Sequence, residues 1–204
     1  MTPPGTFERV YAAIKQRLRE GIYRPGDRLE PAALSDELNA SVTPVRDALH
    51  RLTGERLVDA PRHEGFRVPM LTETQLRQLY SWHLDLLLLA TVKHRAGAFA
   101  GALETAEASA GTSAPHERQN ALFLALARAA GNPEHAAVLE GLSQRIEPVQ
   151  RLEQLFLDGT DLETAAIVNA LQAQDRKALR RSLVLYHRRR ERIVPELLAS
   201  LLQT

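Results

Sequence analysis

The sequence predicts a mainly α protein with two parts: a winged helix-turn-helix domain over residues 1–70 and an all-α bundle of about six helices over residues 71–204. Two observations predict this organisation. In the first seventy residues, three short helical segments are followed by two extended pieces around a glycine, as expected for three helices and a β-hairpin wing. Beyond Met70 the apolar residues recur at helical spacing, without an alternating stretch.

Composition limits the class of protein. The 204 residues are enough to bury a sizeable core, and 44% apolar with 25% charged residues is typical of a soluble globular chain. The absence of cysteine excludes disulfides and thiolate metal sites and favours a cytoplasmic location. The longest apolar run, Leu86–Val92 interrupted by Thr91, is too short to span a bilayer, so no membrane partner is expected. A net charge of +1 means that any attraction for nucleic acid must be local.

The first helix and the second helix are separated by a glycine- and proline-rich turn. One face of the first helix carries Phe7, Val10, Tyr11, Ile14 and Leu18. The segment "GIYRPGDRL" ends that helix, and Pro31 suits the first turn of the second one. The second helix is expected to direct Leu34 and Leu38 inward.

The third helix has two distinct faces. Ser41 or Thr43 can cap it, and Pro44 fits its first turn because the amide lost there has no helical partner. Arg46 and His50, one turn apart, form a polar face. The other face carries Val45, Ala48, Leu49 and Leu52. Two short helices joined by a tight turn, the second with a polar face, indicate a helix-turn-helix.

A hairpin follows the helices. Its limbs are Leu57–Ala60 and Phe66–Met70, and the turn contains Gly65, with Arg62, His63 and Arg67 near the tip. Paired helices alone also occur in bundles that do not bind DNA, and the basic hairpin favours the DNA-binding interpretation. Hydroxyl groups bind phosphate oxygens, and arginine can donate two hydrogen bonds to guanine.

The stretch "GIYRPGDRLEPAALSDELNASVTPVRDALHRLTGERLVDAPRHEGFRV" resembles the winged-helix domain of GntR-family bacterial transcription regulators. The shared elements are the G-x-x-x-PG-x-RL turn, the TPVR-x-AL-x-RL helix and the late glycine of the wing. The resemblance implies that five residues of the helix lie at the DNA, with His63 and Gly65 on the wing; those five are Ser41, Thr43, Pro44, Arg46 and Arg51.

Three positions depart from the family pattern. Val42 stands where the family usually has a base-reading arginine, which leaves the operator sequence open. Gly54 replaces a common charged residue, and Arg56 replaces the usual glycine. Arg56 is expected to be a solvated surface cation, and contact with phosphate is the alternative.

The second part resembles the effector domain of the FadR-type branch of the same family, chiefly in "LARAAGNP" and "AIVNALQAQD". Gly131-Asn132-Pro133 predicts a helix end. The last segment, residues 175–202, is expected to be one long helix with a possible kink at Pro195. The resemblance also implies a small organic effector bound in the bundle.

Many members of that branch hold a divalent metal with one Asp and three His. The corresponding positions here are Gln119, Phe123, Thr164 and Tyr186, so all four ligands are missing. His187 is adjacent to the last position, but one residue along a helix rotates the side chain by about 100°. His83 and His94 are too far apart along their helix to share an ion. We therefore expect no metal at this site and no cofactor.

A cavity with those side chains would be polar and uncharged. His83 stands where relatives often have an arginine that binds the effector, although a packed core histidine is the simpler interpretation. The effector-binding residues implied are His83, Gln119, Phe123, Thr164 and Tyr186, with His187 beside them. This set predicts a neutral or weakly acidic organic ligand. Between Arg176 and Arg192, the basic residues at positions 177, 180, 181, 188 and 192 form a stripe that is expected to be a solvated face, with an acidic ligand or flanking DNA phosphates as the alternatives.

Three functions are compared. The leading prediction is a ligand-responsive transcription regulator that binds double-stranded operator DNA as a homodimer, most commonly as a repressor in this family. In the second, the bundle is only a dimerisation scaffold and binds no ligand. An enzyme is not predicted, because the chain has no P-loop, G-x-S-x-G or H-E-x-x-H motif and no cysteine nucleophile.

Overall fold

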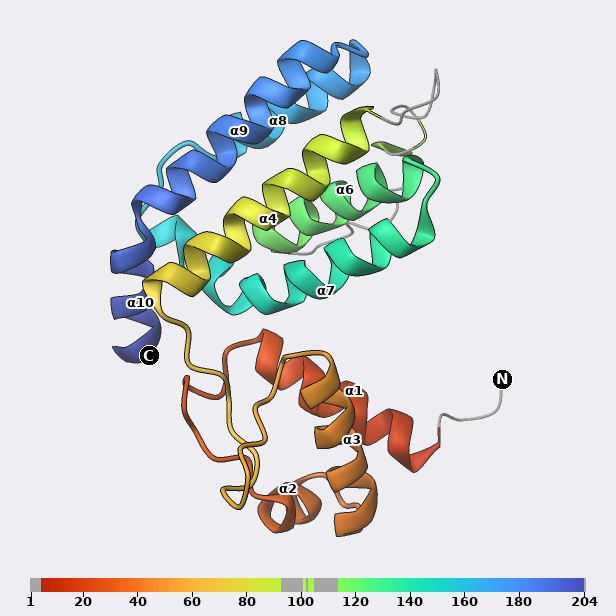
Figure 1. Cartoon of the computed structure of the whole chain (residues 1–204), viewed down its shortest axis with the longest axis vertical. Helices are drawn as coiled ribbons and strands as arrows, with labels where there is room; N and C mark the ends of the chain where they lie inside the picture. Colours follow the sequence, from red (N-terminus) through yellow and green to blue (C-terminus); the bar gives the residue numbers. More distant parts are fainter. Residues whose placement is uncertain (1–4, 93–100, 102, 105–113, 204) are drawn as a thin grey trace. The chain divides into compact units, whose positions relative to one another are not determined.

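The structure is a computed structural model that describes residues 5–92, 101, 103, 104 and 114–203. Contacts divide the chain into two compact units, one of Met1–Thr72 with Ser200–Thr204 and the other of Glu73–Ala199. Each unit has its own apolar core, and Figure 1 labels the helices of both.

The first unit contains α1 (Thr6–Arg19), α2 (Pro31–Glu37) and α3 (Val42–Gly54). Pro31 is in the first turn of α2, as predicted, where a missing amide costs nothing. The predicted inner face of α3 is confirmed, because its four apolar residues are fully buried: Val45, Ala48, Leu49 and Leu52. They pack against α1, whose own buried row is Val10, Ile14 and Leu18.

The wing is shorter than the predicted hairpin. The amides of Asp59 and Arg67 each donate to the other's carbonyl at 2.8 Å, but the described residues contain only isolated bridges and no strand. A third segment, missed from the sequence, pairs on the other side. Leu29 N–H donates to Phe66 O at 2.9 Å, and Val68 N–H donates to Asp27 O at 3.0 Å. The limb after the wing tip is therefore held on both sides.

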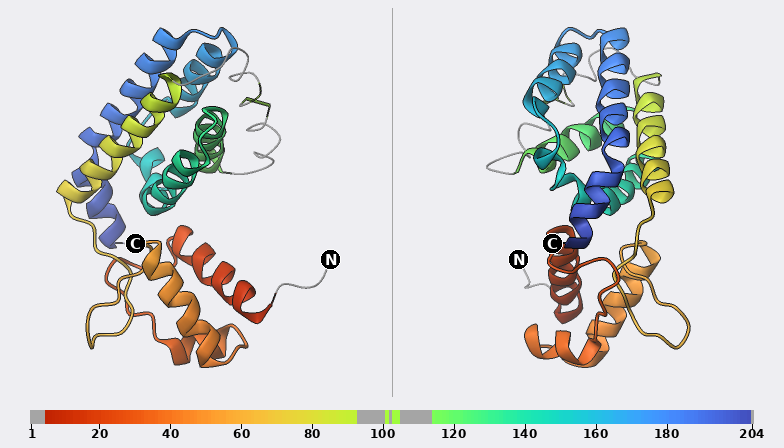
Figure 2. Two further views of the ribbon diagram at one scale, coloured as in Figure 1. Left: turned by 45° about the vertical axis from the view of Figure 1, so that its right-hand side comes forward. Right: turned by 90° about the vertical axis from the view of Figure 1, so that its left-hand side faces the viewer.

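The second unit is a helical bundle. Its α-helices in the described ranges are α4 (Glu73–Val92), α6 (Pro115–Ala129), α7 (Pro133–Gln150), α8 (Thr160–Gln172), α9 (Arg176–Arg192) and α10 (Val194–Gln203), with a 3-10 turn η1 (Glu153–Leu155). α4 packs against α9, α7 and α6, while α8 lies along α9 (Figure 2). His94 lies outside the described residues. No helix in the described part of the chain is long and apolar enough to cross a membrane.

Two side-chain caps and one break define the helix ends. Asn132 accepts hydrogen bonds from the amides of Glu134 and His135, so the turn predicted at Gly131-Asn132-Pro133 is confirmed. Asp175 caps α9 in the same way. The prediction of one long C-terminal helix is wrong: α9 ends at Arg192 and α10 begins at Val194. Pro195 then lies in the first turn of α10, where proline is tolerated.

Candidate functional sites

The N-terminal end of α3 presents an exposed polar surface. Ser41 occupies the N-cap position, but its hydroxyl makes no capping hydrogen bond. Ser41, Thr43 and Arg46 are exposed and Pro44 is half-buried. Because the opposite side of α3 is fully buried, this surface is held rigidly by the core beneath it.

Arg51 has a different environment from Arg46. Its guanidinium lies 4.2 Å from the centre of the Tyr11 ring, and its Nε is 3.4 Å from Glu55 Oε1. Glu55 also accepts hydrogen bonds from Tyr11 and Lys15, both at 2.7 Å. Arg51 is thus part of a polar cluster that joins α3 to α1.

His50, which is exposed, connects the polar face of α3 to the wing. The His50 ring makes an edge contact with Phe66, with centroids 4.9 Å apart. At the wing tip, Gly65 has φ +78° and His63 has φ +64°, and both are exposed. Arg62 is exposed, whereas Arg67 is half-buried and paired with Glu64 at 3.0 Å. The tip therefore presents Arg62 and His63.

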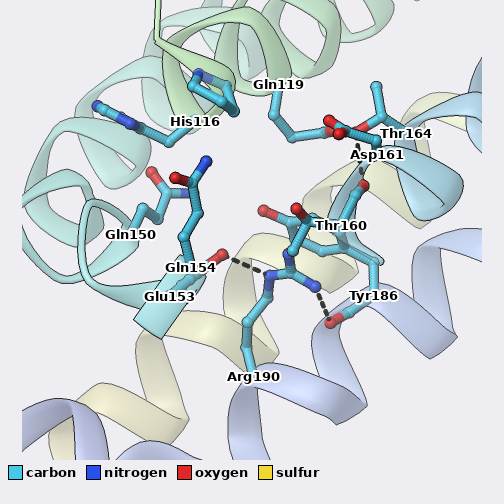
Figure 3. Close-up of a pocket in the computed structure, with 11 residues that line it drawn as sticks. His116, Gln119, Gln150, Glu153, Gln154, Thr160, Asp161, Thr164, Tyr186 and Arg190 are labelled. Atoms are coloured by element: carbon cyan, nitrogen blue, oxygen red, sulfur yellow. Dashed lines mark hydrogen bonds and ion pairs between the residues drawn. The ribbon is translucent and has the colours of Figure 1, made fainter. Parts of the chain in front are cut away.

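The bundle contains a small polar pocket, here called the bundle pocket (Figure 3). Its lining includes Gln119, Gln150, Glu153, Thr164, Tyr186 and Arg190. The Thr164 hydroxyl donates to Gln119 Oε1 at 2.7 Å. Gln119 is 4% exposed, and its Nε2 has no hydrogen-bond partner in the described residues. The volume of about 30 Å³ is room for about two water molecules.

Three of the six predicted effector residues line this pocket, and three do not. Gln119, Thr164 and Tyr186 line it. His83, Phe123 and His187 instead pack against one another in the core beside it, and all three are almost fully buried. The Phe123 and His187 rings each meet the pocket-lining Tyr186 edge-on, with centroids 5.1 Å apart in both pairs.

The two buried histidines form one directed chain of hydrogen bonds. His187 Nδ1 faces the Leu183 carbonyl at 2.8 Å, so this nitrogen carries the hydrogen. His187 Nε2 then accepts from His83 Nδ1 at 2.9 Å, and His83 Nε2 lies 3.0 Å from the oxygen of the Ser143 hydroxyl, which donates to the Leu139 carbonyl at 3.0 Å. Burial lowers the pKa of His187 to about 4 and that of His83 well below its ordinary value. Both rings are neutral near pH 7.

Arg190 lies at the centre of a buried ionic cluster and pairs with two carboxylates. Its Nε donates to Glu153 Oε2 and its Nη1 to Glu163 Oε2, both at 2.8 Å. Arg189 also pairs with Glu163, and Tyr80 donates to Glu153 at 2.9 Å. Burial opposes the charge on Arg190, but Tyr186 and the two carboxylates raise its pKa overall. Two cations and two anions make the cluster neutral.

The basic stripe predicted on α9 runs along positions 177, 180, 181, 188 and 192, and the sequence analysis did not identify Arg190 as buried. Arg190 is only 2% exposed. A signal was available: Leu179, Leu183, Tyr186 and Arg190 follow one another at three- and four-residue spacing, so Arg190 continues the apolar row of α9. Arg181 and Arg188, by contrast, are exposed.

The two units together define a class of protein: a winged helix-turn-helix domain followed by a helical bundle. Solved structures share this fold over nearly the whole chain. The structure of Escherichia coli McbR/YncC has a TM-score of 0.69 at 22% identity and covers 95% of this chain and 98% of its own. A transcriptional regulator from Rhodococcus sp. RHA1 has a TM-score of 0.75 at 19% identity and covers 93% and 97%.

Residues 6–68 match the family "Bacterial regulatory proteins, gntR family", so the first unit is a GntR-family helix-turn-helix domain. The regulator McbR of E. coli is 34% identical over 77 residues, 38% of this chain and 35% of the relative. YdhC, a transcriptional regulator of Bacillus subtilis, is 26% identical over 88 residues, 43% of this chain and 39% of the relative. The matched sequence thus spans little more than a third of these relatives.

Proposed function

We propose that this chain is a sequence-specific DNA-binding transcription regulator that acts in the cytoplasm. The observation that carries the proposal is the exposed N-terminal surface of α3, within a domain of the GntR family. A helix of this kind enters the major groove with its first residues at the bases. The DNA-binding residues proposed are Ser41, Thr43, Pro44, Arg46 and His50, with His63 and Gly65 on the wing. Arg51, which the family pattern also implies, is proposed to stabilise the contact between α3 and α1 instead.

The regulator is proposed to act as a homodimer and as a repressor. One winged helix reads a half-site too short for genomic specificity, and two-fold pairing doubles the length of DNA that is read. The names of the relatives support regulation, since a GlaR protein of E. coli described as a transcriptional repressor is 30% identical over 70 residues.

The test is binding of the full chain to a duplex from the region upstream of its own gene. Fluorescence anisotropy at fixed salt should show tighter binding to this duplex than to a shuffled duplex of equal composition. Sedimentation of the complex should give two chains per duplex. Equal affinity for the two duplexes at low salt would contradict the proposal.

We further propose that a small molecule in the bundle pocket controls DNA binding, as expected for the FadR-type branch. The ionic cluster at the floor of the pocket is neutral, which favours an uncharged ligand over a strong acid. Gln119 Nε2 offers a donor for a ligand oxygen. Typical ligand sites are about 300–1,000 Å³, so the pocket must widen on binding.

The small size of the pocket also favours a second candidate, in which the bundle is only a dimerisation scaffold. A thermal shift experiment with a panel of neutral and weakly acidic metabolites separates the two. A ligand present at about 100 times its Kd stabilises the folded chain by about 2.7 kcal/mol. A Gln119→Leu variant should lose that shift, and a panel without any stabilising compound would favour the scaffold. No catalytic role is proposed in either case.

A further inference from the structure

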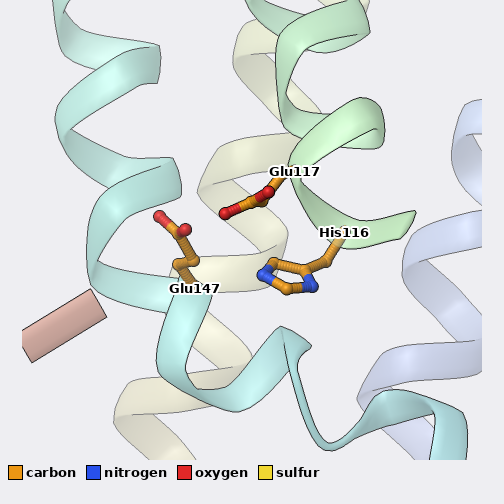
Figure 4. Close-up of side chains that lie close together, drawn as sticks. All are labelled: His116, Glu117 and Glu147. Carbon is orange, nitrogen blue, oxygen red and sulfur yellow. The ribbon is translucent and has the colours of Figure 1, made fainter. Parts of the chain in front are cut away.

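We propose that His116, Glu117 and Glu147 form a binding site for a divalent transition-metal ion at the end of α6 and α7. Their ligand atoms all lie within 4.8 Å of one another. Figure 4 shows the three side chains converging, two from the first turn of α6 and one from α7. The set contains none of the positions 119, 123, 164 and 186, and the inference does not depend on the proposed DNA binding.

The spacing suits an ion after a small closure. Ligand atoms around a tetrahedral ion with bonds of about 2.0–2.2 Å lie about 3.4 Å apart. The ligand atoms therefore need to approach one another by up to about 1.4 Å, which rotation about the side-chain bonds supplies. One Glu117 oxygen accepts a hydrogen bond from the Ala114 amide at 3.0 Å, which orients the carboxylate and leaves its other oxygen for the ion.

The ligand types select the class of metal. One imidazole nitrogen with two carboxylates suits Zn²⁺ or Mn²⁺, whereas Mg²⁺ prefers oxygen ligands and retains most of its water. Glu147 is 3% exposed, so an ion here would be held partly out of solvent. The N-terminal end of the α6 dipole is equivalent to about half a positive charge and repels a cation. The two negative carboxylates outweigh this repulsion.

The bundle pocket provides the remaining coordination positions. His116 lines both the cluster and the pocket, so an ion on this side chain has water-sized space beside it. Gln119, one turn further along α6, has its buried Nε2 at the same pocket without a hydrogen-bond partner in the described residues. An oxygen ligand completing the ion's shell would give this amide an acceptor.

The experiment is equilibrium dialysis of the tag-free full chain against ZnCl₂ or MnCl₂, with metal content measured by mass spectrometry. We expect one ion per chain, and Glu147→Gln and His116→Gln should each weaken binding by at least about tenfold, since loss even of an outer-shell partner costs 10–100-fold. The matched control is Glu140→Gln, also on α7 but in a surface pair with Arg128, which should bind as the unmodified chain does.

Circular dichroism without metal establishes that each variant is folded. If Glu147→Gln fails to fold, metal binding by the His116→Gln variant, which changes a half-buried side chain, is the test. The inference is overturned if the unmodified chain shows no saturable binding, if both variants bind as tightly as the control, or if Mg²⁺ binds in preference to Zn²⁺.

Discussion

At the scale of single residues, the same side chain has two different environments on one helix. Arg46 is exposed on the polar face of α3, whereas Arg51, five positions later, is stacked on Tyr11 and paired with Glu55. The family pattern implies DNA contact for both, but the geometry separates them. A guanidinium held against α1 has fewer hydrogen-bond donors left for a base.

We expect Arg46→Ala to weaken binding to the upstream duplex by tenfold or more, since a bidentate base contact discriminates by about 1–3 kcal/mol. Arg51→Ala should leave DNA affinity nearly unchanged and should lower the free energy of unfolding by up to about 1 kcal/mol, as for an exposed ion pair. Anisotropy and urea denaturation measure the two effects. Equal losses of DNA affinity in both variants would refute the distinction.

The buried histidines predict how stability depends on pH. Burial lowers the pKa of His187 from 6.5 to about 4, with Arg190 acting in the same direction and the Leu183 carbonyl against it. Below pH 6.5 the unfolded chain therefore takes up a proton that the folded chain refuses. The free energy of unfolding should fall as the pH drops from about 6.5 to 4, by up to about 3 kcal/mol from His187 alone. His83 changes stability in the same direction.

Urea denaturation at pH 7, 6 and 5 measures this dependence. His187→Gln should be less stable at pH 7 and less sensitive to pH. His63→Gln, at the exposed wing tip, is the matched control and should keep the full dependence. A His187→Gln variant with the original pH profile would show that the titration lies elsewhere.

At the scale of elements, α9 shows that neighbouring basic residues of one helix can lie in different environments. Its sequence "RRRER" contains the exposed Arg188 and the buried Arg190 two positions apart. Side chains two positions apart on a helix point to nearly opposite sides. Arg190 lies on the side that faces the carboxylates of η1 and α8. Glu153 is 37 residues away in the chain, so local sequence could not identify it as the partner.

We expect Arg190→Met to destabilise the chain by about 3–5 kcal/mol, because it leaves Glu153 buried without its cation. Arg188→Met changes the same residue type on the exposed side and should stay within about 0.5 kcal/mol. Thermal unfolding of both variants is the measurement. Similar melting temperatures would mean that the cluster contributes little.

The caps of α7 and α3 give a second comparison between elements. Asn132 accepts two amide hydrogen bonds at the start of α7, so Asn132→Ala should cost about 1 kcal/mol. Ser41 makes no such bond at the start of α3. Ser41→Ala should therefore leave stability nearly unchanged, and should weaken DNA binding if its hydroxyl contacts phosphate. Denaturation and anisotropy on the two variants separate these roles.

At the scale of the whole molecule, local signals in the sequence predicted the fold well. Pro31, the inner face of α3 and the Asn132 turn are short-range features that a single sequence displays directly. What the sequence did not predict depends on distant partners. The third segment beside the wing needs Leu29 to meet Phe66, and the hydrogen-bond partner of His83 is His187, 104 residues away.

With a net charge of only +1, the chain must attract DNA through a few cationic side chains at the DNA-binding surface. Each phosphate contact contributes about 0.9 to the slope of log affinity against log salt. Changing Arg62, exposed at the wing tip, to Ala should flatten that slope. Arg188, exposed on α9, is the matched control, and its change to Ala should leave the slope unchanged. A slope that changes only in the Arg188 variant would place the DNA on the bundle.

The directed chain through His83 and His187 has a practical consequence for following the bundle in solution. Each ring carries one nitrogen-bound proton that is shielded from solvent and committed to a single acceptor. Such protons exchange slowly and give separate magnetic resonance signals far from the amide region. Their exchange lifetimes would report how often water enters the interior. They would therefore show whether the bundle opens transiently, before any ligand binds, to admit a small molecule.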